Sequence, residues 1–133
     1  MITEDYVSFE TAKLLKEKGF DEPTTKSYYT EGFENPMIFS HDLLPCIQTD
    51  EFLCPTLQMV MKWLRKKYNL HIITLPYAPI DRHPYHPGEA DIVYIAQLFR
   101  GIIPIDEIGR SVIKLTPEEA YDAAIKYCLE NLI

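Results

Sequence analysis

The residues best suited to chemistry lie close together in the segment that runs from His83 to Asp91. It carries two imidazoles and two carboxylates, the ligand types that Zn²⁺ and similar divalent metals prefer. The candidate metal ligands or bases are His83, His86, Glu89 and Asp91. They define one functional hypothesis, a small metal-dependent hydrolase in which His41 or His71 supplies a more distant ligand.

The spacing of this segment permits a metal site without being diagnostic of one. Pro84 and Pro87 hold the backbone extended, so His83 and His86 need not converge, and no helix places them as in an H-E-x-x-H motif. The alternative is a solvated loop whose polar side chains face water. We favour that alternative and expect no resident cofactor, with zinc or another divalent metal only in the hydrolase hypothesis.

The three cysteines show no pattern typical of catalysis or metal binding. Cys46, Cys54 and Cys128 lack Cys-x-x-Cys spacing. Cys54 precedes a predicted helix, where a thiolate would be favoured, but its neighbours Leu53 and Pro55 are typical of a small core residue. We therefore expect reduced and mostly buried thiols.

The densest basic cluster consists of Lys62, Arg65, Lys66 and Lys67, with Trp63 between them. A basic cluster with an aromatic residue is a feature of nucleic-acid sites, which gives a third functional hypothesis. The alternative is that cations in the last turns of a helix are favoured by its dipole. The formal charge of the chain is -7, which repels a phosphate backbone, so nucleic acid is a disfavoured partner.

Helix signals occur in three places along the chain. Ser8 can cap a first helix that Gly19 ends. The middle helix has Pro55 in its first turn and ends at Asn69, with a core stripe of Leu57, Val60, Met61, Leu64 and Tyr68. A third helix begins at a capping box, in which Thr116 and Glu119 exchange hydrogen bonds around Pro117, and runs to the end of the chain.

The predicted strands lie between these helices. Two β-prone runs around residues 27–30 and 37–39 fit a hairpin or a loosely attached excursion within residues 21–49. Residues 71–75 form a strand that Pro76 ends, and residues 76–90 form a Pro-rich loop. Residues 92–99 fit either a strand or one face of a helix, and their β-branched and aromatic residues favour the strand. A further strand is predicted at residues 111–115. The sequence predicts an α+β fold with about three helices on a small, mainly antiparallel sheet.

Length and composition predict one ordinary domain. The chain has 133 residues, 47% of them hydrophobic and 25% charged, which are values typical of a globular protein. The first twenty residues carry Glu4, Asp5, Glu10 and Glu17 and no apolar core of a signal peptide, and no apolar stretch is long enough to span a membrane. We therefore expect a cytoplasmic protein with no membrane partner, spanning residues 1–133 as a single globular domain.

Three segments also carry a family resemblance: MITEDYVSFETAKLLKEKGFDEP, CPTLQMVMKWLRKKYNLHI and TPEEAYDAAIKYCLENLI. They resemble a family of small uncharacterised proteins encoded by gut bacteria and their phages or integrated elements. The resemblance implies a fold in agreement with the one predicted above and a phage or mobile-element origin. It implies no activity and no catalytic residues.

The two sides of the middle helix lead to the preferred functional hypothesis. At 3.6 residues per turn, Met59 and Trp63 lie opposite the core stripe, so both sides of the helix are apolar. Either residues 21–49 fold over Trp63, or another chain covers it, since Trp and Met are enriched at interfaces. We favour a non-enzymatic protein-interaction or self-associating domain with Met59 and Trp63 at the interface. This hypothesis predicts that Trp63→Ala or Met59→Lys changes the oligomeric mass and leaves the fold intact.

Overall fold

The computed structural model describes residues 3–30, 34–40, 51–77, 92–105 and 113–133. The elements follow one another in the order α1 (Phe9–Glu17), β1 (Lys26–Tyr29), β2 (Met37–Ser40), β3 (Glu51–Leu53), α2 (Leu57–Tyr68), β4 (Leu70–Tyr77), β5 (Val93–Arg100), β6 (Ile103–Ile105), β7 (Ile113–Lys114) and α3 (Pro117–Asn131). This is the α+β fold with three helices that the sequence predicts.

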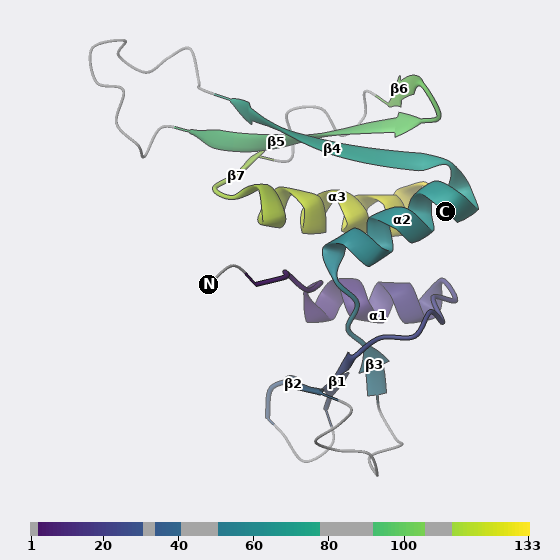
Figure 1. Ribbon diagram of the computed structural model, residues 1–133, viewed down its shortest axis with the longest axis vertical. Helices are drawn as coiled ribbons and strands as arrows, with labels where there is room; N and C mark the ends of the chain where they lie inside the picture. Colours follow the sequence, from purple (N-terminus) through teal and green to yellow (C-terminus); the bar gives the residue numbers. More distant parts are fainter. Residues whose placement is uncertain (1–2, 31–33, 41–50, 78–91, 106–112) are drawn as a thin grey trace.

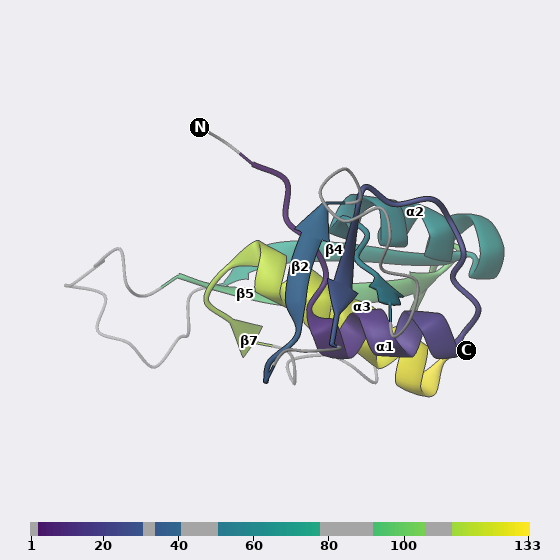
Figure 2. The same cartoon turned by 90° about the horizontal axis from the view of Figure 1, so that it is seen from below.

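The strands divide into two antiparallel sheets at opposite ends of the molecule (Figure 1). One sheet has the order β2-β1-β3. The other pairs β4 with β5 along their whole lengths, and β6 and β7 both pair with β5. From top to bottom in Figure 1, the layers are the four-stranded sheet, then α2 and α3, then α1, then the three-stranded sheet. Figure 2, which views the molecule from below, shows α1 and α3 in front of the long strands β4 and β5.

The first and third helices begin and end where the sequence predicts. The Ser8 hydroxyl accepts a hydrogen bond from the N–H of Thr11, and the Thr116 hydroxyl accepts one from the N–H of Glu119. At the end of α1, Gly19 has a φ of 83° and the N–H of Phe20 donates to the carbonyl of Leu15 at 2.9 Å. This Schellman turn folds Phe20 back against the helices.

Two proline predictions in the middle of the chain are wrong. Pro55 precedes α2 instead of occupying its first turn, because Thr56 is the N-cap and accepts from the N–H of Met59. Pro76 does not end β4, which continues to Tyr77 with Pro76 paired to Tyr94. An edge strand tolerates proline, because one side of its backbone makes no ladder hydrogen bonds. Asn69 ends α2 as expected, in the left-handed conformation with a φ of 55°.

The remaining strand predictions are confirmed where the structure describes them. Residues 27–30 and 37–39 contribute to the β1–β2 hairpin, and β5 settles the ambiguous segment as a strand. Of the strand predicted at residues 111–115, Ile113 and Lys114 form β7 and Leu115 lies after it, while residues 111–112 are outside the described residues. Of the Pro-rich loop predicted at residues 76–90, only residues 76 and 77 are described, and both belong to β4.

The three helices share one hydrophobic core, and the two sheets lie on either side of the helices. Val60, Leu64, Ala124, Ile125 and Cys128 have no exposed surface at all. A half-buried pair of hydrogen bonds joins α1 to α3, since Asp122 accepts from both the backbone N–H and the hydroxyl of Ser8, at 3.0 and 2.9 Å. The N-terminus of α1 is thereby fixed to α3, across a separation of 114 residues in sequence.

Candidate interaction surface

The four-stranded sheet has helices on one face, and the side chains of β4 and β5 alternate across it. The inward positions are Leu70, Ile72, Ala96 and Leu98, all buried in the core. α3 contacts both strands and α2 contacts β4, on the same side of the sheet (Figure 1). Because successive strand residues point to opposite faces, the intervening residues face away from the helices.

Most of the described outward positions of β4 and β5 are also apolar. Ile73 is 41% exposed and Leu75 is 38% exposed, on β4. Across the ladder from them on β5 lie Gln97, opposite Ile73, and Ile95, opposite Leu75. Phe99 lies opposite His71. We call this surface, made of His71, Ile73, Leu75, Ile95, Gln97 and Phe99, the outer face.

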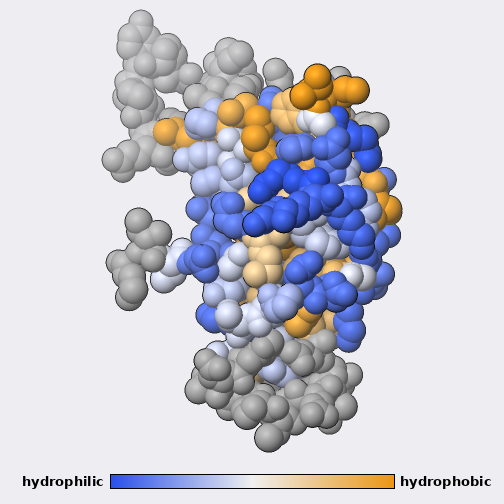
Figure 3. Space-filling model, turned by 45° about the vertical axis from the view of Figure 1, so that its right-hand side comes forward, coloured by the Kyte–Doolittle hydropathy of each residue, from blue (hydrophilic) through white to orange (hydrophobic). Residues whose placement is uncertain are grey.

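Further exposed apolar residues lie near β6, at the end of the sheet and outside the outer face, because Ile103 pairs with Arg100 and so shares the side of the inward Leu70. Ile102 and Ile103 are 94% and 68% exposed, in and just after the turn from β5. In Figure 3, hydrophobic side chains gather at the top of the molecule, over this sheet, above a hydrophilic belt. A large contiguous apolar patch on a protein surface marks an interaction site.

The outer face carries no carboxylate, lysine or arginine among the six residues that define it. The two strands of the outer face, about 4.8 Å apart and five residues long at about 3.3 Å per residue, give a plan area of roughly 160 Å². Side chains that stand up from the sheet, and the residues around its rim, add accessible surface to this figure. The plan area is about a quarter of the roughly 600 Å² per partner at the lower end of specific interfaces, so a contact through the outer face must also use the residues around its rim.

A signal for the outer face was present in the sequence. In an antiparallel sheet with one face on the core and one face exposed to solvent, apolar and polar residues alternate along each strand. Residues 71–75 and 92–99 instead carry apolar residues at consecutive positions, as strands covered on both faces do. In the part of the chain that the structure describes, the helices pack on one face of these strands. The second apolar face is not covered by them.

The two residues predicted for the interface lie elsewhere, on α2. Trp63 is 8% exposed, and the rings of Phe20 and Tyr68 pack edge-on against it at centroid distances of 5.3 and 5.4 Å. Met59 is half-buried beside it. Phe20 and the segment that follows it therefore account for the second apolar side of α2 within one chain, while an interface at Met59 and Trp63 stays a prediction.

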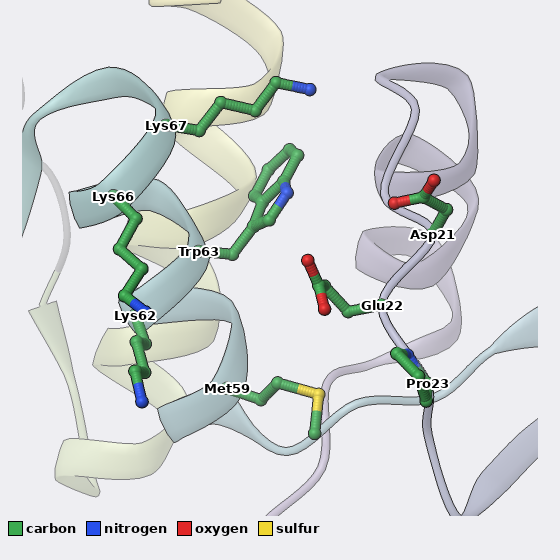
Figure 4. A pocket seen from close by; sticks show the side chains of 8 residues that line it. All are labelled: Asp21, Glu22, Pro23, Met59, Lys62, Trp63, Lys66 and Lys67. Carbon is green, nitrogen blue, oxygen red and sulfur yellow. The ribbon is translucent and has the colours of Figure 1, made fainter.

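Three of the four residues of the basic cluster line a pocket between α2 and the segment after α1 (Figure 4). Lys62, Lys66 and Lys67 line it from α2, and Asp21 and Glu22 line it from the other wall. Two carboxylates beside the lysines weaken the attraction of this surface for a polyanion. Binding of nucleic acid stays a disfavoured prediction.

The histidine segment lies outside the described residues, so the candidate ligands His83, His86, Glu89 and Asp91 have no described geometry. Among the residues that the structure does describe, no group of three or more His, Cys, Asp or Glu side chains could hold a metal ion. His71 pairs with the side chain of Asn69 at 3.2 Å. The metal-dependent hydrolase stays a prediction.

The two described cysteines are poor nucleophiles. Cys54 and Cys128 are free and have no exposed surface. Burial raises the pKa of the Cys54 thiol to about 11 and that of the Cys128 thiol to about 12. Both therefore remain protonated at neutral pH, and a protonated, inaccessible thiol does not attack a substrate. The expectation of buried, reduced thiols holds for these two residues.

No known family model matches the chain, and no curated protein or solved structure is significantly similar to it. The resemblance to phage-associated proteins is thus a prediction that these comparisons leave open. Within the described residues, every helix is too short or too polar to cross a lipid bilayer.

Proposed function

We propose that this protein is a non-enzymatic, self-associating domain, and that it binds a second copy of itself through the outer face of the four-stranded sheet. The observation that supports this proposal is the apolar, uncharged surface formed by Ile73, Leu75, Ile95 and Phe99 on the side of the sheet opposite the helices. Burial of apolar area is the main source of free energy in protein association.

Electrostatics favours this face for contact between two copies. The chain carries a formal charge of -7, so two copies repel each other over most approaches. A face free of carboxylates is where that repulsion is weakest. Two antiparallel sheets can also pack face to face, about 10 Å apart, with their apolar side chains interdigitated.

Gln97 is a further reason to expect a second copy as the partner. It is an exposed polar residue among the apolar positions of β5. A primary amide has both donors and an acceptor, so it can pair with the same amide of a symmetry-related copy. In a contact with twofold symmetry, the same patch of each copy forms the interface. The amide groups of Gln97 from the two copies can then hydrogen-bond to each other, with no other kind of partner.

Sedimentation equilibrium over a wide range of protein concentrations tests this proposal. We expect the average mass to rise from that of one chain to twice that value, with little change when salt is raised, because the contact is apolar. A mass equal to that of a single chain at every concentration would exclude self-association. A mass that doubles only at low salt would show a charge-driven contact elsewhere.

A further inference from the structure

One edge of the four-stranded sheet is open in the part of the chain that the structure describes. β4 is the outer strand at this edge, because it pairs with β5 on one side and with no described strand on the other. It has 8 residues and contains no lysine, arginine, aspartate or glutamate. Edge strands are usually short or charged, which prevents them from pairing with another chain. β4 is neither, so it is well suited to accept a further strand.

The backbone groups that face this open edge follow from the pairing of β4 with β5. The N–H of Gly101 donates to the carbonyl of Asn69 at 2.8 Å, in register with that ladder. Because hydrogen-bonded and non-hydrogen-bonded pairs alternate in an antiparallel ladder, Ile72, Thr74 and Pro76 direct their backbone groups away from β5. Pro76 agrees with this assignment, since a residue without an N–H fits where the ladder needs no donor. The N–H groups of Ile72 and Thr74 therefore point to where an added strand would lie.

Two cations of α2 lie beside the open edge. α2 contacts β4, and Figures 1 and 2 both show it toward the β4 side of the ladder. Trp63 packs against Phe20, on the side of α2 that faces α1. At 3.6 residues per turn, Arg65 lies almost opposite Trp63, on the side of the four-stranded sheet. Lys62 is the neighbour of Arg65 one turn earlier on the helix surface.

The charges of Lys62 and Arg65 are not neutralised within the described structure. Both side chains are exposed, and among the described residues neither forms an ion pair. In Figure 4 the ammonium group of Lys62 points away from Asp21 and Glu22. Because the chain as a whole carries a formal charge of -7, this basic surface is a local exception. It favours a partner strand that carries carboxylates.

We infer that the open edge of β4 binds an extended, acidic segment of a partner protein, which adds a strand to the sheet. The backbone of that segment pairs with β4, and its carboxylates lie by Lys62 and Arg65. A second copy of this chain is a poorer occupant, because twofold pairing of two β4 edges would bring the cations of both α2 helices together. Nucleic acid cannot add a strand, because it has no peptide groups to pair with β4.

A peptide of alternating residues tests this inference: acetyl-Thr-Val-Glu-Val-Glu-Val-Thr amide. In an extended strand its two Glu side chains lie on one face and its Val side chains on the other. Each exposed ion pair contributes about twofold to fivefold in affinity, so this form should bind about tenfold more tightly than a form with Gln in place of Glu. A form with Lys in place of Glu should bind most weakly. The formal charge of -7 by itself favours the opposite order.

Amide NMR spectra of isotope-labelled protein measure these affinities and locate the peptide. We expect the largest shifts at the N–H groups of Ile72 and Thr74, which would donate to the added strand. N-methylation of the central Glu-Val-Glu should abolish binding, because it removes donors from both edges of the peptide. Tightest binding of the Lys form, unchanged binding of the N-methylated form, or no shift at Ile72 and Thr74 at millimolar peptide would each overturn the inference.

Two exposed charge variants test the part played by α2. Lys62→Gln and Arg65→Gln should each weaken binding of the Glu peptide about twofold to fivefold and leave binding of the Gln peptide unchanged. Lys13→Gln, the same loss of charge at an exposed position of α1, is the matched control and should change neither affinity. A preference for the Glu peptide that survives both α2 variants would place its carboxylates elsewhere and overturn the assignment.

Discussion

Replacing Trp63 with alanine should lower the free energy of unfolding by about 3–5 kcal/mol, the range measured for large aromatic residues in protein cores. The indole is 8% exposed and packs edge-on against Phe20 and Tyr68, so its removal leaves a cavity beside these two rings. Urea unfolding followed by circular dichroism measures the loss, since the variant has no tryptophan to report it.

Trp63→Phe is the matched control for this change. It keeps an aromatic ring against Phe20 and should cost less, about 1–2 kcal/mol. A loss below about 1 kcal/mol in Trp63→Ala would show that the indole is not part of the core. That result would restore the sequence-based hypothesis, in which Trp63→Ala leaves the fold intact and changes the oligomeric mass.

Ile73→Lys should weaken self-association at least about a hundredfold. In the monomer this side chain is 41% exposed, so a lysine there reaches water and the fold is retained. In the proposed dimer its ammonium would be buried between two apolar faces without a counter-charge, which costs several kcal/mol per ion. A cost of about 2.7 kcal/mol already corresponds to a hundredfold change in dissociation constant. Sedimentation equilibrium measures the shift.

Ile38→Lys provides a control of the same residue type and nearly the same exposure. Ile38 is 42% exposed, on β2 of the three-stranded sheet at the other end of the molecule. This variant should dimerise as the unchanged protein does. If both variants weaken the dimer equally, the added charge acts through overall electrostatics and not through the outer face.

Much of the fold could be predicted from local sequence signals, because each has a short-range physical cause. Ser8 and Thr116 cap helices with their own hydroxyls, and Gly19 and Asn69 adopt the left-handed turns that end them. Pro55 was misplaced for a local reason, because the adjacent Thr56 is the N-cap of α2, whereas Pro76 misled the prediction for the opposite reason. Whether proline interrupts an element depends on which backbone side is paired, and that is set by strands distant in the sequence.

The candidate site was less predictable, because it depends on which faces remain uncovered after the elements pack. Helical spacing correctly shows that Trp63 lies on a second apolar side of α2, but the Schellman turn at Gly19 brings Phe20 onto it from a distant part of the sequence. The apolar runs of β4 and β5 indicate two faces that need cover. Only the arrangement of the helices shows that one of these faces stays open in the described structure.

The central claim concerns which surface two copies share, and isotope-filtered NMR on a mixture of labelled and unlabelled protein tests it most directly. We expect nuclear Overhauser effects between the methyl groups of Ile73, Leu75 and Ile95 on one copy and the same residues or Phe99 on the other. Contacts between copies at Met59 of α2, or at β1 and β2, would contradict the assignment of the outer face, as would the absence of any intermolecular contact at concentrations where the mass has doubled.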